Sequence, residues 1–158
     1  MFRSTFFLIP LVIVFTSHLA HGAKAAGDST STVTSTGVDP RQLVEMPEQA
    51  RQFMREDMLE HTSALNAIIG YLAVSNLDAA AEVAESKMGE SSMGEHRASG
   101  MGPGRFMPLE MRKIGWGMHE AASEFARIAK KGDLKSAYSA LQKVTSACVA
   151  CHYSYRTR

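Results

Sequence analysis

Apolar residues recur at steps of three and four along most of the chain after residue 40, a spacing that is typical of amphipathic helices. Over residues 47–71 this apolar stripe includes Met58 and Leu65, and His61 falls on the same face. Pro47 suits the first turn of a helix, because its missing N–H would have no intrahelical partner there. We therefore predict a long helix over residues 47–71.

Three further helices are expected from the same periodicity. Residues 77–88 follow Asn76, a good N-cap, and residues 108–131 precede Gly132, which is suited to ending a helix. The fourth helix is predicted over residues 134–155. Because no segment alternates apolar and polar residues as a strand would, the fold class is predicted to be all-α, an antiparallel four-helix bundle.

The segment between the second and third helices, residues 89–107, is predicted to be a long loop, because glycine, serine and proline interrupt any period. Long ordered loops are often functional. Methionine and histidine side chains in it invite a copper-site interpretation, but their irregular spacing does not favour one. These residues are Met93, His96, Met101 and Met107.

The chain begins with a short basic and apolar segment that differs from the helices. Arg3 precedes an apolar run over residues 6–15, and small residues follow it. This is typical of a cleaved signal peptide, and the run is shorter than the roughly 20 apolar residues that a membrane span requires. We predict a signal peptide over residues 1–25, a flexible Ser/Thr-rich linker over 26–40 and one folded domain over 41–158. The mature protein is expected in the periplasm, without a membrane span.

The charge balance limits the class of partner. The chain carries 17 Lys and Arg against 16 Asp and Glu. Removing Arg3 and Lys24 with the predicted signal peptide leaves 15 basic and 16 acidic residues, a net charge of −1. A nearly neutral protein is not expected to bind nucleic acid.

Two cysteines lie near the end of the fourth predicted helix, in the segment Cys148-Val149-Ala150-Cys151-His152. The pattern Cys-x-x-Cys-His is typical of covalent haem attachment. On a helix, thiols at positions i and i+3 project from one side, where they can add to the two vinyl groups along one edge of a porphyrin. His152 follows directly and can bind the iron as the proximal ligand. We therefore predict one covalently bound haem c.

Two other interpretations of the cysteine pair are weaker. A redox-active disulfide of the thioredoxin kind normally opens a helix after a strand, where the helix dipole lowers a thiol pKa. This pair instead closes a helix near the chain end. A structural zinc site usually takes four cysteine or histidine ligands, and the chain has 2 cysteines.

A haem motif on the last of four helices resembles the layout of the class II c-type cytochromes, the cytochrome c-prime family and its low-spin relatives. The resemblance covers residues 47–158, and outside Cys148–His152 it is one of layout more than of residues. It implies the four-helix bundle of that family. It also implies redox partner proteins, and a homodimer formed through the first two helices.

The resemblance further implies that the sixth position of the iron faces the first helix, where low-spin members have a ligating methionine and high-spin members an apolar residue. Met58 is the predicted distal ligand, because it lies on the apolar stripe and a thioether is a soft ligand suited to haem iron. His61 is the main alternative and Met54 is a third. A methionine on such a stripe is also a common core residue, so the sixth ligand stays open.

Further residues are candidate haem contacts. Arg55, and with it Arg51, lies near the same face of the first helix, where a guanidinium can pair with a haem propionate. Tyr155, three residues after His152, can cover the proximal side of the ring. Their ordinary interpretations are exposed helix charge and core packing. His119 on the third helix is interpreted as structural.

These residues favour one-electron transfer outside the cytoplasm, with haem iron cycling between the ferrous and ferric states. The alternative is a five-coordinate protein that binds nitric oxide or carbon monoxide, which requires Met58 and His61 to stay off the iron. The chain has no nucleophile-elbow pattern, no phosphate-binding glycine loop and no paired carboxylates placed for acid-base chemistry. It is therefore not expected to be an enzyme.

Overall fold

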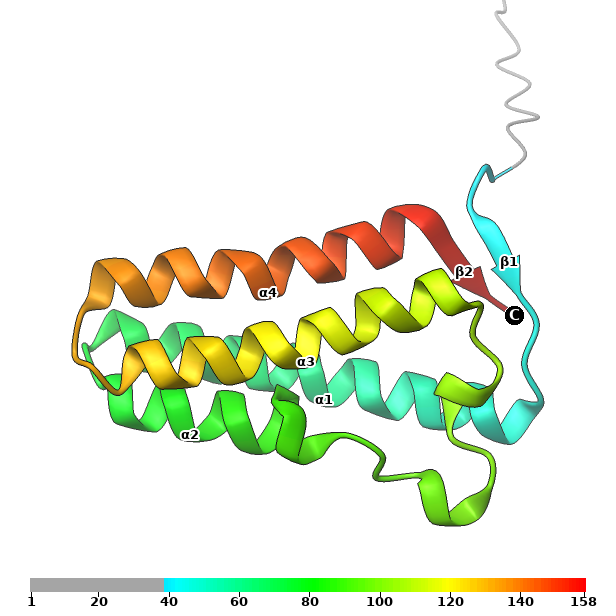
Figure 1. Cartoon of the computed structure of the whole chain (residues 1–158), viewed down its shortest axis with the longest axis horizontal. Coiled ribbons are helices and arrows are strands. Elements are labelled where there is room, and N and C mark those ends of the chain that lie inside the picture. Colours follow the sequence, from blue (N-terminus) through cyan, green and yellow to red (C-terminus); the bar gives the residue numbers. More distant parts are fainter. Residues whose placement is uncertain (1–38) are drawn as a thin grey trace, which may run out of the picture. The chain divides into compact units, whose positions relative to one another are not determined.

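The computed structural model describes residues 39–158, and most of the predicted linker and the whole predicted signal peptide lie outside them. The described chain forms four α-helices and two short strands: β1 (Gln42–Val44), α1 (Glu48–Ala73), α2 (Leu77–Met88), α3 (Leu109–Ala129), α4 (Leu134–Ser154) and β2 (Tyr155–Thr157). The helices lie side by side as a bundle (Figure 1). This confirms the predicted all-α class. Within residues 39–158, no helix has both the length and the apolar composition to cross a lipid bilayer.

Each predicted helix is present, and side-chain caps begin two of them. The Asn76 side chain accepts a hydrogen bond from the Ala79 amide at 3.2 Å and begins α2. The Asp133 side chain does the same for the Ser136 amide at 3.1 Å and begins α4. Between α3 and α4, Gly132 has a φ of +81°, a left-handed conformation that glycine adopts without steric cost.

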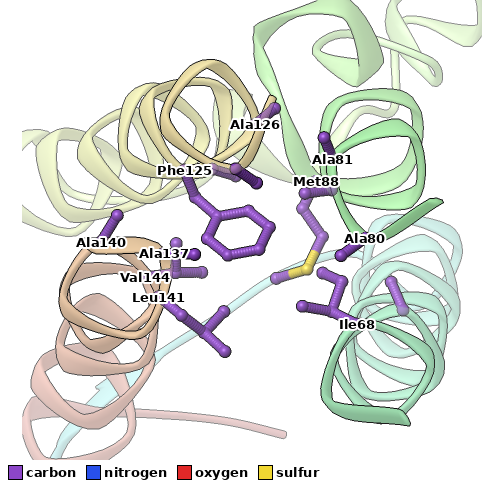
Figure 2. Packing of buried hydrophobic residues seen from close by; sticks show 14 of the residues in the cluster. Ile68, Ala80, Ala81, Met88, Phe125, Ala126, Ala137, Ala140, Leu141 and Val144 are labelled. Atoms are coloured by element: carbon purple, nitrogen blue, oxygen red, sulfur yellow. The ribbon is translucent and has the colours of Figure 1, made fainter. Parts of the chain in front are cut away.

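The core is centred on Phe125, which is fully buried. Figure 2 shows its ring pointing from α3 into the middle of the bundle, towards Met88 of α2 and Leu141 of α4, with Ile68 of α1 nearby. All four helices therefore contribute to one apolar core. Many of its buried positions are alanines, including Ala122, Ala126 and Ala129 on α3 and Ala137 and Ala140 on α4.

The helices do not pack on one another equally. α3 and α4 have the most extensive contact, followed by α1 with α2 and α2 with α3, whereas α1 and α4 make few or no close approaches. Small side chains let α3 and α4 approach closely, because alanine adds little volume between two helix backbones. α4 therefore meets α1 through core side chains and not through close approach of the two backbones.

The two strands correct the sequence-based prediction. β1 and β2 pair in parallel, with Gln42 opposite Tyr155 and Val44 opposite Thr157, whereas the fourth helix was predicted to reach Tyr155. Three-residue strands are too short to show a clear alternation, and this pair depends on hydrogen bonds between the two ends of the folded region. Next to them, the Arg156 Nε donates to the Arg41 carbonyl oxygen at 3.3 Å.

Phe125→Ala should lower the free energy of unfolding by about 3–5 kcal/mol, because it leaves a cavity at the centre of the core. Urea denaturation followed by far-ultraviolet circular dichroism measures this loss. Leu59→Ala is the control, since Leu59 is 72% exposed, and it should change the free energy by less than about 0.5 kcal/mol. Equal effects of the two substitutions would show that the core is not centred on Phe125.

Candidate functional site

The two cysteines continue the apolar stripe of α4. Ala137, Leu141 and Val144 are buried, and Cys148 and Cys151 follow at the same steps of four and three residues. Both cysteines are half-buried and neither forms a disulfide. The helical periodicity thus turns both thiols to the inner side of α4.

Cys148 and Cys151 contact two different apolar clusters. Cys148 packs against the main core, whereas Cys151 packs against a second cluster, which we call the end cluster. It lies where β1, the start of α1, the start of α3 and the end of α4 meet (Figure 1). Its members are the buried Val44, Met46, Ala50, Met54 and Met111 and the half-buried Met58, Phe106, Met107, Cys151 and Tyr155.

The environment of the thiols favours their protonated form. Burial raises the pKa of Cys148 and of Cys151, and the nearby Cys148 raises that of Cys151 further. The Cys148 Sγ also approaches the Val144 carbonyl oxygen at 3.4 Å. A redox-active cysteine of the thioredoxin kind has a lowered pKa, so this pair lacks the electrostatics of such a site.

His152 lies in the last turn of α4 and is exposed. Its neighbours Val149 and Tyr153 are apolar or aromatic and are 55% and 81% exposed. The turn that carries the motif is therefore accessible on its outer side. On its inner side, Tyr155 belongs to the end cluster and its amide donates to the Cys151 carbonyl oxygen, which ends the helix.

The structure separates His61 from the two methionine candidates for the distal ligand. Met54 is buried and Met58 half-buried in the end cluster, where Cys151 also lies. His61 instead faces His119, with ring centroids 5.8 Å apart in an edge-to-face arrangement. Burial lowers the pKa of His61, and the neighbouring His119 lowers it further. The two methionines thus share a cluster with the haem motif, and His61 has a different set of neighbours.

The two arginines on α1 differ in exposure. The Arg55 side chain is 62% exposed and its closest carboxylate contact is Glu48 at 3.8 Å. The Arg51 side chain is 26% exposed and also pairs with Glu48, yet its Nε is buried without a hydrogen-bond partner among the described residues. An anionic group next to Arg51 would satisfy that donor. Arg51 is thus less exposed than Arg55 and has a buried donor that a propionate would satisfy.

Sequence reasoning missed a third arginine. The Nε of Arg112 on α3 is likewise buried without a partner in the described part of the chain, and its guanidinium lies 5.9 Å from the Trp116 ring centroid. The available signal in the sequence was the spacing of four residues between Arg112 and Trp116, which puts both side chains on one face of α3. That spacing alone does not distinguish a buried arginine from an exposed one.

These residues fit a covalently attached haem. Two thiols and an imidazole lie within five residues at the end of α4, a thioether from α1 lies in the same apolar cluster as one of the thiols, and the Arg51 Nε is buried without a hydrogen-bond partner among the described residues. Apolar surroundings suit the porphyrin face and arginines suit its propionates.

The family model described as Cytochrome C' matches residues 108–156. This match confirms the predicted resemblance to the class II c-type cytochromes. It spans α3, α4 and the haem motif, and it supports a c-type cytochrome that binds haem. Met58 and the rest of α1 lie outside the matched segment. No curated protein and no solved structure matches the chain significantly.

The raised thiol pKa values predict slow alkylation. In chain produced without haem, iodoacetamide should modify Cys148 and Cys151 more slowly than ordinary free cysteine at the same pH, because a raised pKa leaves less thiolate. The same chain in urea is the control and should react as ordinary free cysteine does. Faster alkylation of the folded chain than of the unfolded chain would show that folding does not raise the pKa of these thiols.

Proposed function

We propose that this protein is an exported one-electron carrier with a single haem c. Cys148 and Cys151 hold the haem covalently, His152 is the proximal iron ligand and Met58 the distal one. The scaffold is an antiparallel four-helix bundle, with the haem near the C-terminal helix. The pattern of residues 1–25 supports transfer to the periplasm. Redox partner proteins are the expected partners.

The observation that carries the proposal is that Met58 of α1 and Cys151 of α4 belong to one apolar cluster. α1 and α4 also make few or no close approaches, as do α1 with α3 and α2 with α4. A flat ring attached to α4 through the cysteines would therefore meet α1 on its other face. Met58 shares apolar surroundings with Cys151, whereas the His61 ring lies against His119 of α3, and this difference supports Met58 over His61.

Each residue has a distinct task in this arrangement. The two thioether bonds fix the position of the ring relative to α4, and the end cluster excludes water from it. Arg51 neutralises a propionate and so completes its own buried hydrogen bonding. Haem bound here supplies reversible one-electron iron chemistry, and a Met/His ligand pair raises its reduction potential.

The exposed outer side of the last α4 turn suits electron exchange. Val149 and Tyr153 flank His152 and are 55% and 81% exposed. Weak electron-transfer partners form small interfaces, and an accessible proximal side lets a partner approach the iron without opening the bundle. The haem can therefore stay in its apolar surroundings while an electron passes to or from the partner.

The first test is an optical spectrum of the purified haem-loaded protein, ferric and ferrous, with and without carbon monoxide. The wild type should be low-spin and should not bind carbon monoxide, because Met58 fills the sixth position. Met58→Ala should be high-spin and should bind carbon monoxide. Met54→Ala, one turn earlier in the same cluster, and His61→Ala are matched controls and should stay low-spin.

The contrary outcome is equally clear. A wild type that is already high-spin and binds carbon monoxide would make Met58 a packing residue. The five-coordinate gas-binding function would then replace electron transfer. If the wild type is low-spin and only the His61→Ala variant is high-spin, His61 is the distal ligand.

Replacement of the cysteines tests the covalent link. Cys148→Ser and Cys151→Ser should each leave one thioether bond, and the double variant should lose its haem when the protein is denatured in acidic acetone. His152→Ala should keep the haem attached but change its spectrum, because only the iron ligand is lost. Haem that stays bound to the double variant after denaturation would refute covalent attachment through this motif.

A further inference from the structure

The loop between α2 and α3 covers a cavity of about 460 Å³. The loop includes three short 3-10 helices, Glu90–Ser92, Arg97–Ser99 and Pro103–Arg105. The cavity is lined by residues of α1, α2, α3 and the loop, and by none of α4. It is therefore separate from the motif that carries the cysteines. Its lining includes three of the chain's histidines, His61, His96 and His119.

Three metal-ligating groups converge in this cavity. One ligand atom each from Asp57, Glu95 and His96 can be chosen so that all lie within 4.8 Å of one another. The His96 Nε2 is 3.0 Å from the Asp57 Oδ1. A zinc ion about 2.0–2.2 Å from both atoms would hold them roughly that far apart. The loop thus places Glu95 and His96 next to the Asp57 carboxylate of α1.

The His96 ring is held in place by packing. It stacks on the Phe53 ring with centroids 4.1 Å apart and an angle of 7° between the planes. Phe53 lies one turn before Asp57 on α1, so the ring and the carboxylate reach His96 from the same helix. Rigid support of this kind is what a metal-binding imidazole needs.

Two more imidazoles line the same cavity. The His119 Nδ1 donates a hydrogen bond to the Met88 carbonyl oxygen at 2.8 Å, which leaves the lone pair on Nε2. Metal-binding histidines commonly donate their other ring N–H in this way. His61 lies four residues after Asp57 on α1, and burial lowers its pKa, which favours the neutral form. Neutral imidazole is the form that binds a metal.

We propose that the cavity under the loop binds one divalent transition-metal ion of the zinc or copper kind, with Asp57, Glu95 and His96 as its ligands. One imidazole nitrogen and two carboxylate oxygens suit these borderline ions better than calcium or magnesium, which prefer oxygen ligands alone. Further coordination positions are left to His61 or to water. The ion would fix the loop to α1, and none of its proposed ligands is a proposed haem ligand.

The test is a calorimetric titration of the haem-loaded protein with zinc chloride. One zinc ion should bind per chain, and Asp57→Asn and His96→Gln should each weaken binding by at least about tenfold. Glu56→Gln is the matched control, because it removes an exposed carboxylate next to Asp57 and should leave binding unchanged. Copper(II) added instead should give an electron paramagnetic resonance signal with nitrogen coupling that is reduced in His96→Gln.

Circular dichroism and the haem spectrum of each variant distinguish a lost ligand from a lost fold. Weaker zinc binding in a variant with unchanged helicity and haem spectrum supports the site. The absence of stoichiometric zinc binding to the wild type overturns the proposal. So does zinc binding that is equally tight in the wild type and in the double variant Asp57→Asn/His96→Gln, because the His96–Asp57 contact would then only hold the loop in place.

Discussion

The close packing of α4 on α3 is the constraint on which the rest of the structure depends. Alanines such as Ala129 on α3 and Ala137 on α4 are fully buried and let these two helices approach closely. α4 is therefore held from one side, and its face towards α1 is left to the cysteines and the end cluster. Near Cys151 the side chains of the end cluster, among them Met54 and Met58, lie between α4 and α1.

The end of the bundle shows how distant segments close this region. β1 supplies Val44 to the end cluster and β2 supplies Tyr155, and their parallel pairing joins the start of the folded chain to its end. Arg41 lowers the pKa of Asp39 to about 2 through a hydrogen-bonded ion pair beside the strands. Tyr155, which follows the last turn of α4, is thus held by its pairing with β1. This fixes the direction in which the chain leaves the haem motif.

Local features of the structure could be predicted from the sequence, and features that join distant residues could not. The helices follow from their periodicity and caps, and Cys148–His152 is recognisable because its chemistry lies within five residues. The strands were missed because they pair residues at opposite ends of the domain. His96 was left without a role because Asp57 is 39 positions away. Met54, Met58 and His61 share one stripe, and packing separates His61 from the two methionines but does not separate the methionines from each other.

The two sites meet on α1. Successive residues of a helix point about 100° apart, so Met58 can belong to the end cluster while its neighbour Asp57 contacts His96 across the loop cavity. Met107 connects the two regions directly, because it lines the cavity and also packs against the end cluster. A change in the loop that moves Met107 therefore alters the packing around Met58. The geometry at the proposed distal ligand thus depends on the loop as well as on α1, and this gives the long segment between α2 and α3 a structural role next to the haem motif.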